Sequence, residues 1–434
     1  MSSIRKSIVL GVAMLALPVL ASAQTSRVEG MALQGDYIKD YTGIYTYTSG
    51  VSSVGNLIYG ELGTTSTTPS GALLDRSIGA VLGNLWDGRY GTWAIHLREW
   101  TPALGQGDVF GQPNPGTLGF DPNSNSNESF DLMWGQKMGT TSVGLRLNRS
   151  YFKLEDALPG VTTTLKFDVP SALANGDPNL SRNVLGFGGG VGFEMNPNTN
   201  VEFSLLYQSR DFENSVSGGT RSEDDNTSNW MVGGRAFWQW QPNVVVTPVL
   251  KFYRFDLSTK STPTGGNSTT FTNTLSGWQA GVAGNWTIGS NDLFVLGATF
   301  AQNDLEQQYD VLGVSAGVTA SGFAVGDTLK VTEHLVPQVF AALETHINNW
   351  LTFRMGANKG AFESVKLKDL GAGGREVNLS MSSFNMNLGM GVKLGTLQLD
   401  AVLNNLFPQT LGGWFSNSPS GFIAFPKVTA TYAF

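Results

Sequence analysis

Hydrophobic and polar positions alternate along most of the chain from residue 78 onward. In segments of about ten residues, apolar side chains take every second position, and polar side chains or glycines take the positions between them. This period of two is typical of β-strands with one apolar and one polar face. The clearest examples are the segments 142–150, 350–358, 383–394 and 396–404.

Short and long connections alternate strictly between these segments. Bacterial barrels show this asymmetry, with short periplasmic turns and long outer loops. The connections define 15 strands, and a sixteenth at 54–62 gives the even number usual for such barrels. We therefore predict an all-β transmembrane barrel, antiparallel and up-and-down, of about 16 strands over residues 54–434, with 14 or 18 as the neighbouring counts. The predicted turns are at 87–91, 139–140, 196–199, 241–243, 289–292, 348–349 and 395, and the long connections lie near 101–128, 155–182, 211–228, 256–273, 303–333, 360–378 and 405–421.

Composition favours strands over membrane helices. The chain is 41% hydrophobic and only 14% charged, with 54 glycines. No apolar run after residue 23 approaches the ~20 residues that a membrane helix needs. The net charge of -7 provides no basic surface for nucleic acid. The absence of cysteine excludes disulfides and thiolate metal sites.

The first 23 residues predict a secretory signal peptide. Arg5 and Lys6 precede an apolar run at 8–20, which ends in small residues at 21–23. A charged start, about a dozen apolar residues and an A-x-A site are the features of a cleaved signal. The run is too short for a membrane anchor and contains Pro18. We therefore expect export from the cytoplasm.

Tryptophans gather beside the short turns. Indole rings favour a membrane interface because the ring is apolar while its N–H can reach water or headgroups. Tryptophans at equivalent depths therefore predict a girdle at the periplasmic interface. Its members are Trp86, Trp93, Trp240, Trp286 and Trp350.

The last residues form an amphipathic segment that ends in aromatic side chains. Tyr432 and Phe434 lie on its apolar face, and Lys427 occupies a polar position ahead of them. The segment resembles the C-terminal insertion signal of Gram-negative outer-membrane β-barrels, with Thr429 where glycine is usual. The resemblance implies a location in the bacterial outer membrane, contact with its lipid, and recognition of these residues by the outer-membrane assembly machinery.

The polar faces of the strands carry charges of both signs, with more cations than anions. A barrel of this many strands is too wide for side chains to fill, so we expect these faces to line a water-filled lumen. The interpretation is a porin-like channel for passive diffusion of small polar solutes, with a weak preference for anions. The alternative is a plugged barrel in which the charges pair. The predicted pore-lining residues are Arg98, Asp131, Lys137, Arg146, Glu194, Glu202, Arg235, Lys251, Glu344, Arg354, Lys393 and Asp400.

Residues 24–53 form a separate N-terminal segment, periplasmic or lumenal, ahead of the first strand. Tyr37, Tyr41 and Tyr45 follow each other there at the helical spacing i, i+4, i+8. This arrangement resembles the N-terminal hatch of the FadL family of long-chain fatty acid transporters. The resemblance implies an alternative function, transport of hydrophobic compounds past a hatch that plugs the lumen. A short helix or extended arm in the periplasmic mouth is the other interpretation.

Catalysis finds little support in the sequence. His96, His334 and His346 stand without a G-x-S-x-G motif or closely spaced carboxylates, so we expect no enzyme, cofactor or metal.

A third function is a structural or adhesive barrel, or a sheath for a partner protein in the lumen. Porins are often homotrimers, which makes a homotrimer one assembly to test. The apolar loop 311–326 and the aromatic stretch 406–415 either fold inward as a constriction or extend the strands.

Overall fold

The computed structural model describes most of the chain from residue 26 onward. The predicted signal peptide, the loop 311–326 and the stretch 406–415 lie outside the described residues. No helix among the described residues is long and apolar enough to cross a membrane. The described residues are 26–64, 74–83, 85–101, 126–154, 178–216, 219, 221–225, 228–256, 258–265, 268–289, 291–310, 328–361, 363–369, 376–403 and 425–434.

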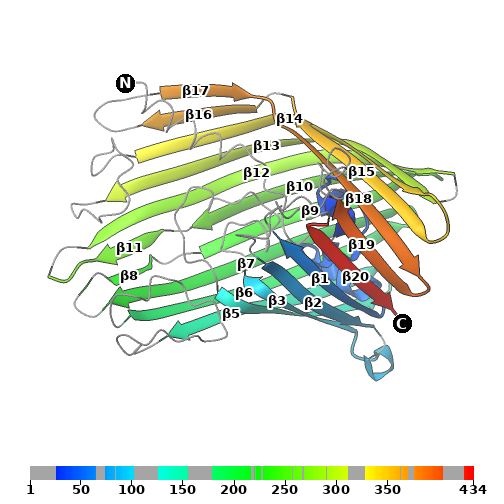
Figure 1. Cartoon of the computed structure of the whole chain (residues 1–434), viewed down its shortest axis with the longest axis horizontal. Helices are drawn as coiled ribbons and strands as arrows, with labels where there is room; N and C mark the ends of the chain where they lie inside the picture. Colours follow the sequence, from blue (N-terminus) through cyan, green and yellow to red (C-terminus); the bar gives the residue numbers. More distant parts are fainter. Residues whose placement is uncertain are drawn as a thin grey trace, which may run out of the picture.

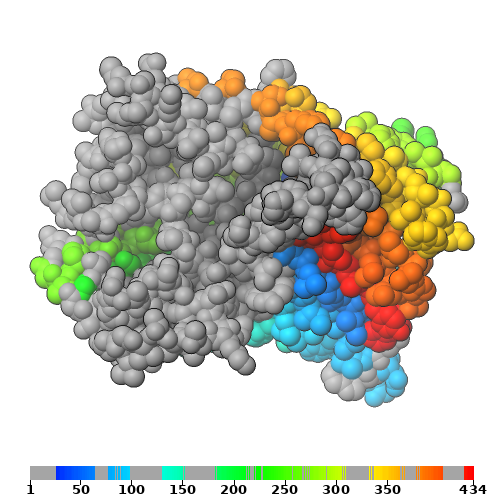
Figure 2. Space-filling model, in the orientation of Figure 1, coloured from blue at the N-terminus to red at the C-terminus, as the bar shows by residue number. Residues whose placement is uncertain are grey.

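Sixteen strands form a closed antiparallel barrel, which confirms the predicted fold (Figure 1). Each strand pairs with the next, and β20 pairs with β1 to close the wall. Figure 2 shows the first strand, in blue, against the last strand, in red. In order, the strands are β1 (Leu57–Thr64), β2 (Leu74–Leu82), β3 (Thr92–Thr101), β4 (Ser126–Met138), β5 (Thr141–Leu154), β6 (Pro178–Asn196), β7 (Thr199–Val216), β9 (Ser228–Gln241), β10 (Val244–Asp256), β12 (Thr269–Ile288), β13 (Asp292–Asp310), β14 (Thr328–His346), β15 (Leu351–Gly360), β18 (Phe384–Leu394), β19 (Leu397–Leu403) and β20 (Lys427–Ala433).

The seven predicted turns fall between paired strands, but several strands are much longer than predicted. β6, β7, β12, β13 and β14 have 18 to 20 residues each. Their outer parts carry polar residues on both faces, as at Asp304 and Glu306 on one face of β13 and Asn303 and Gln307 on the other, so the alternation ends before the strand does. Four short strands continue the wall inside stretches predicted as loops. They are β8 (Arg221–Asp224), β11 (Thr259–Thr262), β16 (Glu363–Asp369) and β17 (Glu376–Met381).

The outward face of the wall is an apolar belt. On β9, Trp230 and Trp240 are both exposed on this face, ten residues apart. Ten residues span about 33 Å along a strand, or about 25 Å across the membrane at the usual tilt of about 40°. The belt therefore matches the hydrocarbon thickness that an outer-membrane barrel covers.

The predicted girdle tryptophans lie at the end of the barrel that carries the short turns. Trp93 begins β3 beside the first turn, and its indole N–H donates to the carbonyl of Tyr90 at 3.1 Å. Trp240 and Trp350 are exposed, and the ring of Trp286 lies 5.7 Å from that of Phe294. The side chain of Trp86 lies outside the described residues. Their contact with lipid stays a prediction.

The two faces of β20 have different surroundings. Tyr432 and Phe434 are exposed on the outward face, with stacked rings 6.1 Å apart. Lys427 and Thr429 are buried on the lumenal face. The chain end lies beside the short turns, because the amide of Ala433 donates to the carbonyl of Thr396. This is the periplasmic end by the asymmetry of bacterial barrels.

Replacing Tyr432 or Phe434 by aspartate is expected to impair assembly, because both positions require an apolar side chain at the membrane edge. Heat-modifiable mobility of the protein in outer-membrane fractions measures the folded fraction. The matched control is Ala433→Asp, which places the same charge on the opposite face of the strand. Normal assembly of Y432D and F434D would contradict the predicted signal.

Candidate functional site: a lumenal plug

Residues 26–53, here called the plug, fill the lumen near the short turns. They form one helical turn, α2 (Ser26–Glu29), and three 3-10 helices, η1 (Gly35–Tyr37), η2 (Tyr41–Tyr45) and η3 (Thr48–Ser53). The plug is drawn in dark blue in Figure 1. Most of its side chains are buried, and Val28, Met31, Tyr37 and Tyr47 are fully buried.

Local sequence sets the turns of the plug. The carboxylate of Asp40 caps η2 by accepting from the amide and hydroxyl of Thr42 at 3.0 and 2.7 Å, which satisfies donors at the helix start. Two apolar clusters then hold the segment to the wall. Val28, Met31 and Tyr37 pack with Val249 and Phe340 in the first. Plug residues Ile44, Tyr45 and Val51 pack with Tyr59, Val81 and Met133 in the second.

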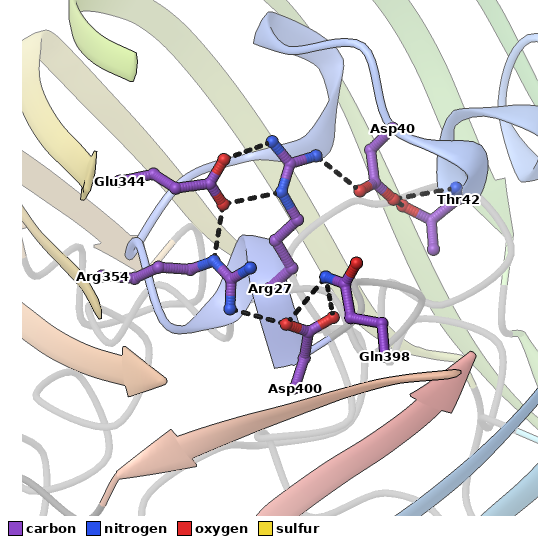
Figure 3. Close-up of polar contacts among 7 residues, drawn as sticks. All are labelled: Arg27, Asp40, Thr42, Glu344, Arg354, Gln398 and Asp400. Atoms are coloured by element: carbon purple, nitrogen blue, oxygen red, sulfur yellow. Dashed lines mark hydrogen bonds and ion pairs between the residues drawn. The ribbon is translucent and has the colours of Figure 1, made fainter. Parts of the chain in front are cut away.

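A chain of five charged residues connects the start of the plug to the wall (Figure 3). Both guanidinium contacts of Arg27 with the Glu344 carboxylate of β14 measure 2.8 Å, and Arg27 also reaches Asp40 at 3.1 Å. Glu344 accepts from Arg354 of β15 at 2.6 Å, and Arg354 donates to Asp400 of β19 at 2.7 Å. The bidentate geometry fixes the direction as well as the distance of the contact.

Three further ion pairs of the wall contact the plug at other points around the barrel. Lys251 of β10 pairs with Asp36 of the plug. Arg235 of β9 pairs with Glu202 of β7 at 2.6 Å, and its guanidinium lies 4.2 Å from the centre of the Tyr47 ring. These contacts place plug residues against both β9 and β10.

The third ion pair joins β4 and β5. Arg146 of β5 pairs with Asp131 of β4 at 2.7 Å and donates to the backbone carbonyl of Tyr45 at 2.6 Å. His96 of β3 lies beside them, with its Nδ1 3.5 Å from the Asp131 carboxylate and its ring 5.0 Å from that of Tyr45. The wall charges therefore hold plug backbone as well as plug side chains.

The last strand also holds the plug. Lys427 bridges two carboxylates, Glu29 of the plug at 3.2 Å and Glu61 of β1 at 2.9 Å. The amide of Ser26 donates to the hydroxyl of Thr429 at 3.1 Å. A residue predicted as part of an assembly signal thus also fastens the plug.

Glycines on the lumenal face let the plug backbone touch the wall. A Cβ added to Gly144 of β5 would overlap the carbonyl of Thr48, and one added to Gly356 of β15 would overlap the carbonyl of Met31. On β6, every residue on this face between 186 and 192 is glycine. These are Gly186, Gly188, Gly190 and Gly192.

The predicted pore-lining residues separate into three groups. Eight are buried on the lumenal face and belong to the ion pairs above. Lys137 and Glu194 pair with each other nearer the short turns, and both are exposed. Lys393 is exposed near the end of β18, and the side chain of Arg98 lies outside the described residues. The eight buried residues are Asp131, Arg146, Glu202, Arg235, Lys251, Glu344, Arg354 and Asp400.

Burial raises the pKa of Tyr37, Tyr41 and Tyr47 above that of a free phenol. A free tyrosine ionises near pH 10, whereas the docked plug keeps these phenols neutral to higher pH. A raised pKa contributes stability that is complete below about pH 10 and lost above it, by about 1.4 kcal/mol per pH unit for each phenol.

We therefore expect the plug to undock as the pH rises from 9 to 11. The measurement is ionic conductance of the refolded barrel in planar bilayers across this range. A variant with phenylalanine at all three tyrosine positions should lose the pH response. Conductance that stays constant in the native protein up to pH 11 would contradict this expectation.

Apolar side chains also face the lumen, on the side of the plug anchors away from the short turns. On β10, Tyr253 and Phe255 share the buried face with Lys251, and each is only 2% exposed. Cross-strand pairing aligns Leu206 of β7, Met231 of β9 and Tyr253 in one row. Phe255 pairs with Leu275 of β12 in the next row. We call these five residues the lumenal apolar patch.

The lumenal apolar patch was not predicted from the sequence. Each strand was expected to have one apolar and one polar face, but both faces are apolar over part of β10. The signal was present in the pair Phe252-Tyr253, because a wall between lipid and open water would not carry large apolar side chains at consecutive positions.

The closed wall, the apolar belt and the buried N-terminal segment define a plugged outer-membrane β-barrel protein of the bacterial type. No protein-family model matches the chain, and no curated protein matches it in sequence. Among solved structures, the toluene transporter TodX of Pseudomonas putida shares 8% identity at a TM-score of 0.37, with 94% of this chain and 95% of TodX covered. The toluene transporter TbuX of Ralstonia pickettii shares 10% at 0.35, covering 94% and 96%.

Larger barrels also match. The siderophore receptor PiuA of Acinetobacter baumannii shares 9% identity at a TM-score of 0.42, with 80% of this chain and 63% of PiuA covered. The copper transporter OprC shares 10% at 0.39, with 80% and 61% covered. This chain thus spans less than two thirds of the length of these two proteins.

Proposed function

We propose that this protein transports small hydrophobic compounds across the outer membrane, with the plug closing the lumen to free diffusion. The lumenal apolar patch carries the proposal. Its five side chains, each at most 7% exposed, follow the plug anchors along the same faces of β7, β9, β10 and β12, so the lumenal side of the wall beyond the plug is apolar at these positions. An apolar lumen wall favours apolar solutes over polar ones.

Passive diffusion of polar or anionic solutes has less support. The predicted anion preference depended on unpaired inward cations, and Arg146, Arg235, Lys251 and Arg354 are each paired with a carboxylate. Paired charges attract a counter-ion far less than a free cation does. The porin function therefore stays a prediction, as does the sheath for a partner protein.

Uptake of naphthalene by cells that carry the protein tests the proposal. Polar replacement within the patch, as in Leu206→Asn or Met231→Gln, should reduce the uptake rate several-fold because the solute loses its apolar surface. The matched control is Val402→Gln, which introduces an amide at a buried apolar position of β19, outside the patch. Heat-modifiable mobility verifies that each variant is folded.

The same measurements, with a swelling assay, distinguish the proposed transport from the porin function and from the structural or sheath function. Uptake that is unaffected in the L206N and M231Q variants would overturn the proposal. Swelling of sugar-filled liposomes by the native protein would support the porin. If the native protein admits neither naphthalene nor sugars, the structural or sheath function is favoured.

A further inference from the structure

Among the buried hydroxyl groups that have no hydrogen-bond partner within the described residues, two lie close to one glycine of the wall. They are the phenol of Tyr47, in the plug, and the hydroxyl of Ser204, on β7. Tyr47 is 0% exposed and Ser204 is 4% exposed. A buried hydroxyl without a partner costs about 1 to 3 kcal/mol, so such groups call for an explanation.

The two hydroxyls converge on one glycine. A Cβ added to Gly233 of β9 would lie 3.2 Å from the Ser204 hydroxyl, 3.5 Å from the Tyr47 hydroxyl and 3.7 Å from the Cγ of Lys251. Ser204, Gly233 and Lys251 are cross-strand partners in one row of the wall. The fold thus brings two unpaired hydroxyls together beside a position of this row that lacks a side chain.

The neighbouring row of the wall is apolar. Leu206 and Tyr253 follow Ser204 and Lys251 by two residues, and Met231 precedes Gly233 by two on the antiparallel strand, so all three lie on the same face as the first row. A polar spot therefore adjoins the lumenal apolar patch directly. A solute that covers both would need a polar head of small size on a hydrophobic body.

The charges around the hydroxyls determine what kind of head fits. Lys251 is paired with Asp36, and Arg235, whose guanidinium lies over the Tyr47 ring, is paired with Glu202. Both nearby cations are thus neutralised by carboxylates, so an anionic head would enter a buried site without a counter-charge. A neutral oxygen faces no such penalty and can accept from both hydroxyls.

We infer that Tyr47 and Ser204 form a polar subsite for a neutral oxygen group, and that the transported compounds are hydrophobic molecules bearing one hydroxyl or carbonyl. This inference rests on the proposed transport of hydrophobic compounds and names their chemical class. Because Tyr47 belongs to the plug and Ser204 to the wall, the bound oxygen group contacts the plug and the wall at the same time.

Binding of 1-naphthol and naphthalene to the protein in lipid nanodiscs tests the subsite, with empty nanodiscs correcting for partition into lipid. One or two hydrogen bonds should favour naphthol by about fivefold or more. Tyr47→Phe and Ser204→Ala should each bring this ratio close to one. Both variants remove a hydroxyl that makes no bond, so the folded barrel should keep its thermal stability. Gly233→Ala should lower naphthol affinity by filling the space between the hydroxyls.

Two control variants carry the same substitutions at positions outside the subsite. Tyr207→Phe changes an exposed tyrosine on the outward face of β7, and Ser222→Ala changes a serine on β8. Both should retain the preference for naphthol. A ratio that survives in Y47F and S204A would overturn the subsite.

The remaining outcomes are also decisive. Equal binding of naphthol and naphthalene by the native protein would overturn the subsite but leave the proposed transport intact, with the hydroxyls serving only a buried water. Tighter binding of 1-naphthoate than of naphthol would overturn the neutral class in favour of anions. Binding of none of the three probes would overturn the proposed function itself.

Discussion

Replacing Glu344 by alanine is expected to undock the plug. This carboxylate accepts from Arg27 of the plug and from Arg354 of the wall, and its side chain is buried. Removing it leaves one neutralising carboxylate for each guanidinium, Asp40 for Arg27 and Asp400 for Arg354. The loss is then that of the charged hydrogen bonds between Arg27 and Glu344, and a hydrogen bond to a charged group typically contributes about 1.5 to 3 kcal/mol. The undocked population should therefore rise by about tenfold or more.

The absence of native cysteine provides a direct measurement. A Ser49→Cys variant places a thiol in the buried part of the plug, where it reacts with a water-soluble maleimide only after undocking. The rate of labelling should increase strongly when Glu344→Ala is added to S49C. The matched control is Glu194→Ala, which removes a carboxylate of the exposed pair with Lys137 and should change the rate little. Equal rates for E344A and E194A would contradict the role of the Arg27 contact.

Adding a single methyl group to Gly144 or Gly356 is expected to displace the plug as well. A Cβ at either position would overlap backbone carbonyl groups of the plug, Thr48 and Met31 respectively. Backbone atoms cannot rotate aside as a flexible side chain can, so the plug itself must shift. Gly144→Ala and Gly356→Ala should therefore raise labelling of S49C while the barrel remains folded.

Gly189→Ala is a matched control for this pair. Gly189 lies in β6 among the lumenal glycines but on the opposite face, and no atom lies within 4 Å of an added Cβ. Heat-modifiable mobility reports whether each barrel is intact. If G144A and G356A label no faster than G189A, the close contact between plug backbone and wall is not what holds the plug.

The barrel was predictable because each membrane strand has to satisfy lipid on one face and the lumen on the other. Apolar and polar residues therefore alternate along the strand, as in Val143 to Asn148. The strict alternation of short turns and long loops follows from the up-and-down topology. Strand lengths were not predictable in the same way. Outside the membrane both faces of β12 and β13 meet water, so backbone pairing continues without an alternating pattern.

The site was only partly predictable. The inward direction of Arg146, Arg235 and Arg354 followed from the strand faces, but their partners did not. Arg27 and Glu344 are 317 residues apart, and only the folded barrel brings them together. The alternating glycines of β6 were a usable signal, because a wall facing open water has no need for bare backbone at every second position.

Planar-bilayer conductance measures directly whether the plug closes the lumen. The native barrel should show negligible single-channel conductance, whereas a variant lacking residues 26–53 should form a stable open channel. S49C with Glu344→Ala should open intermittently between these limits. Large, steady conductance of the native protein would show that the plug does not close the lumen. A deletion variant that conducts as little as the native protein would show the same.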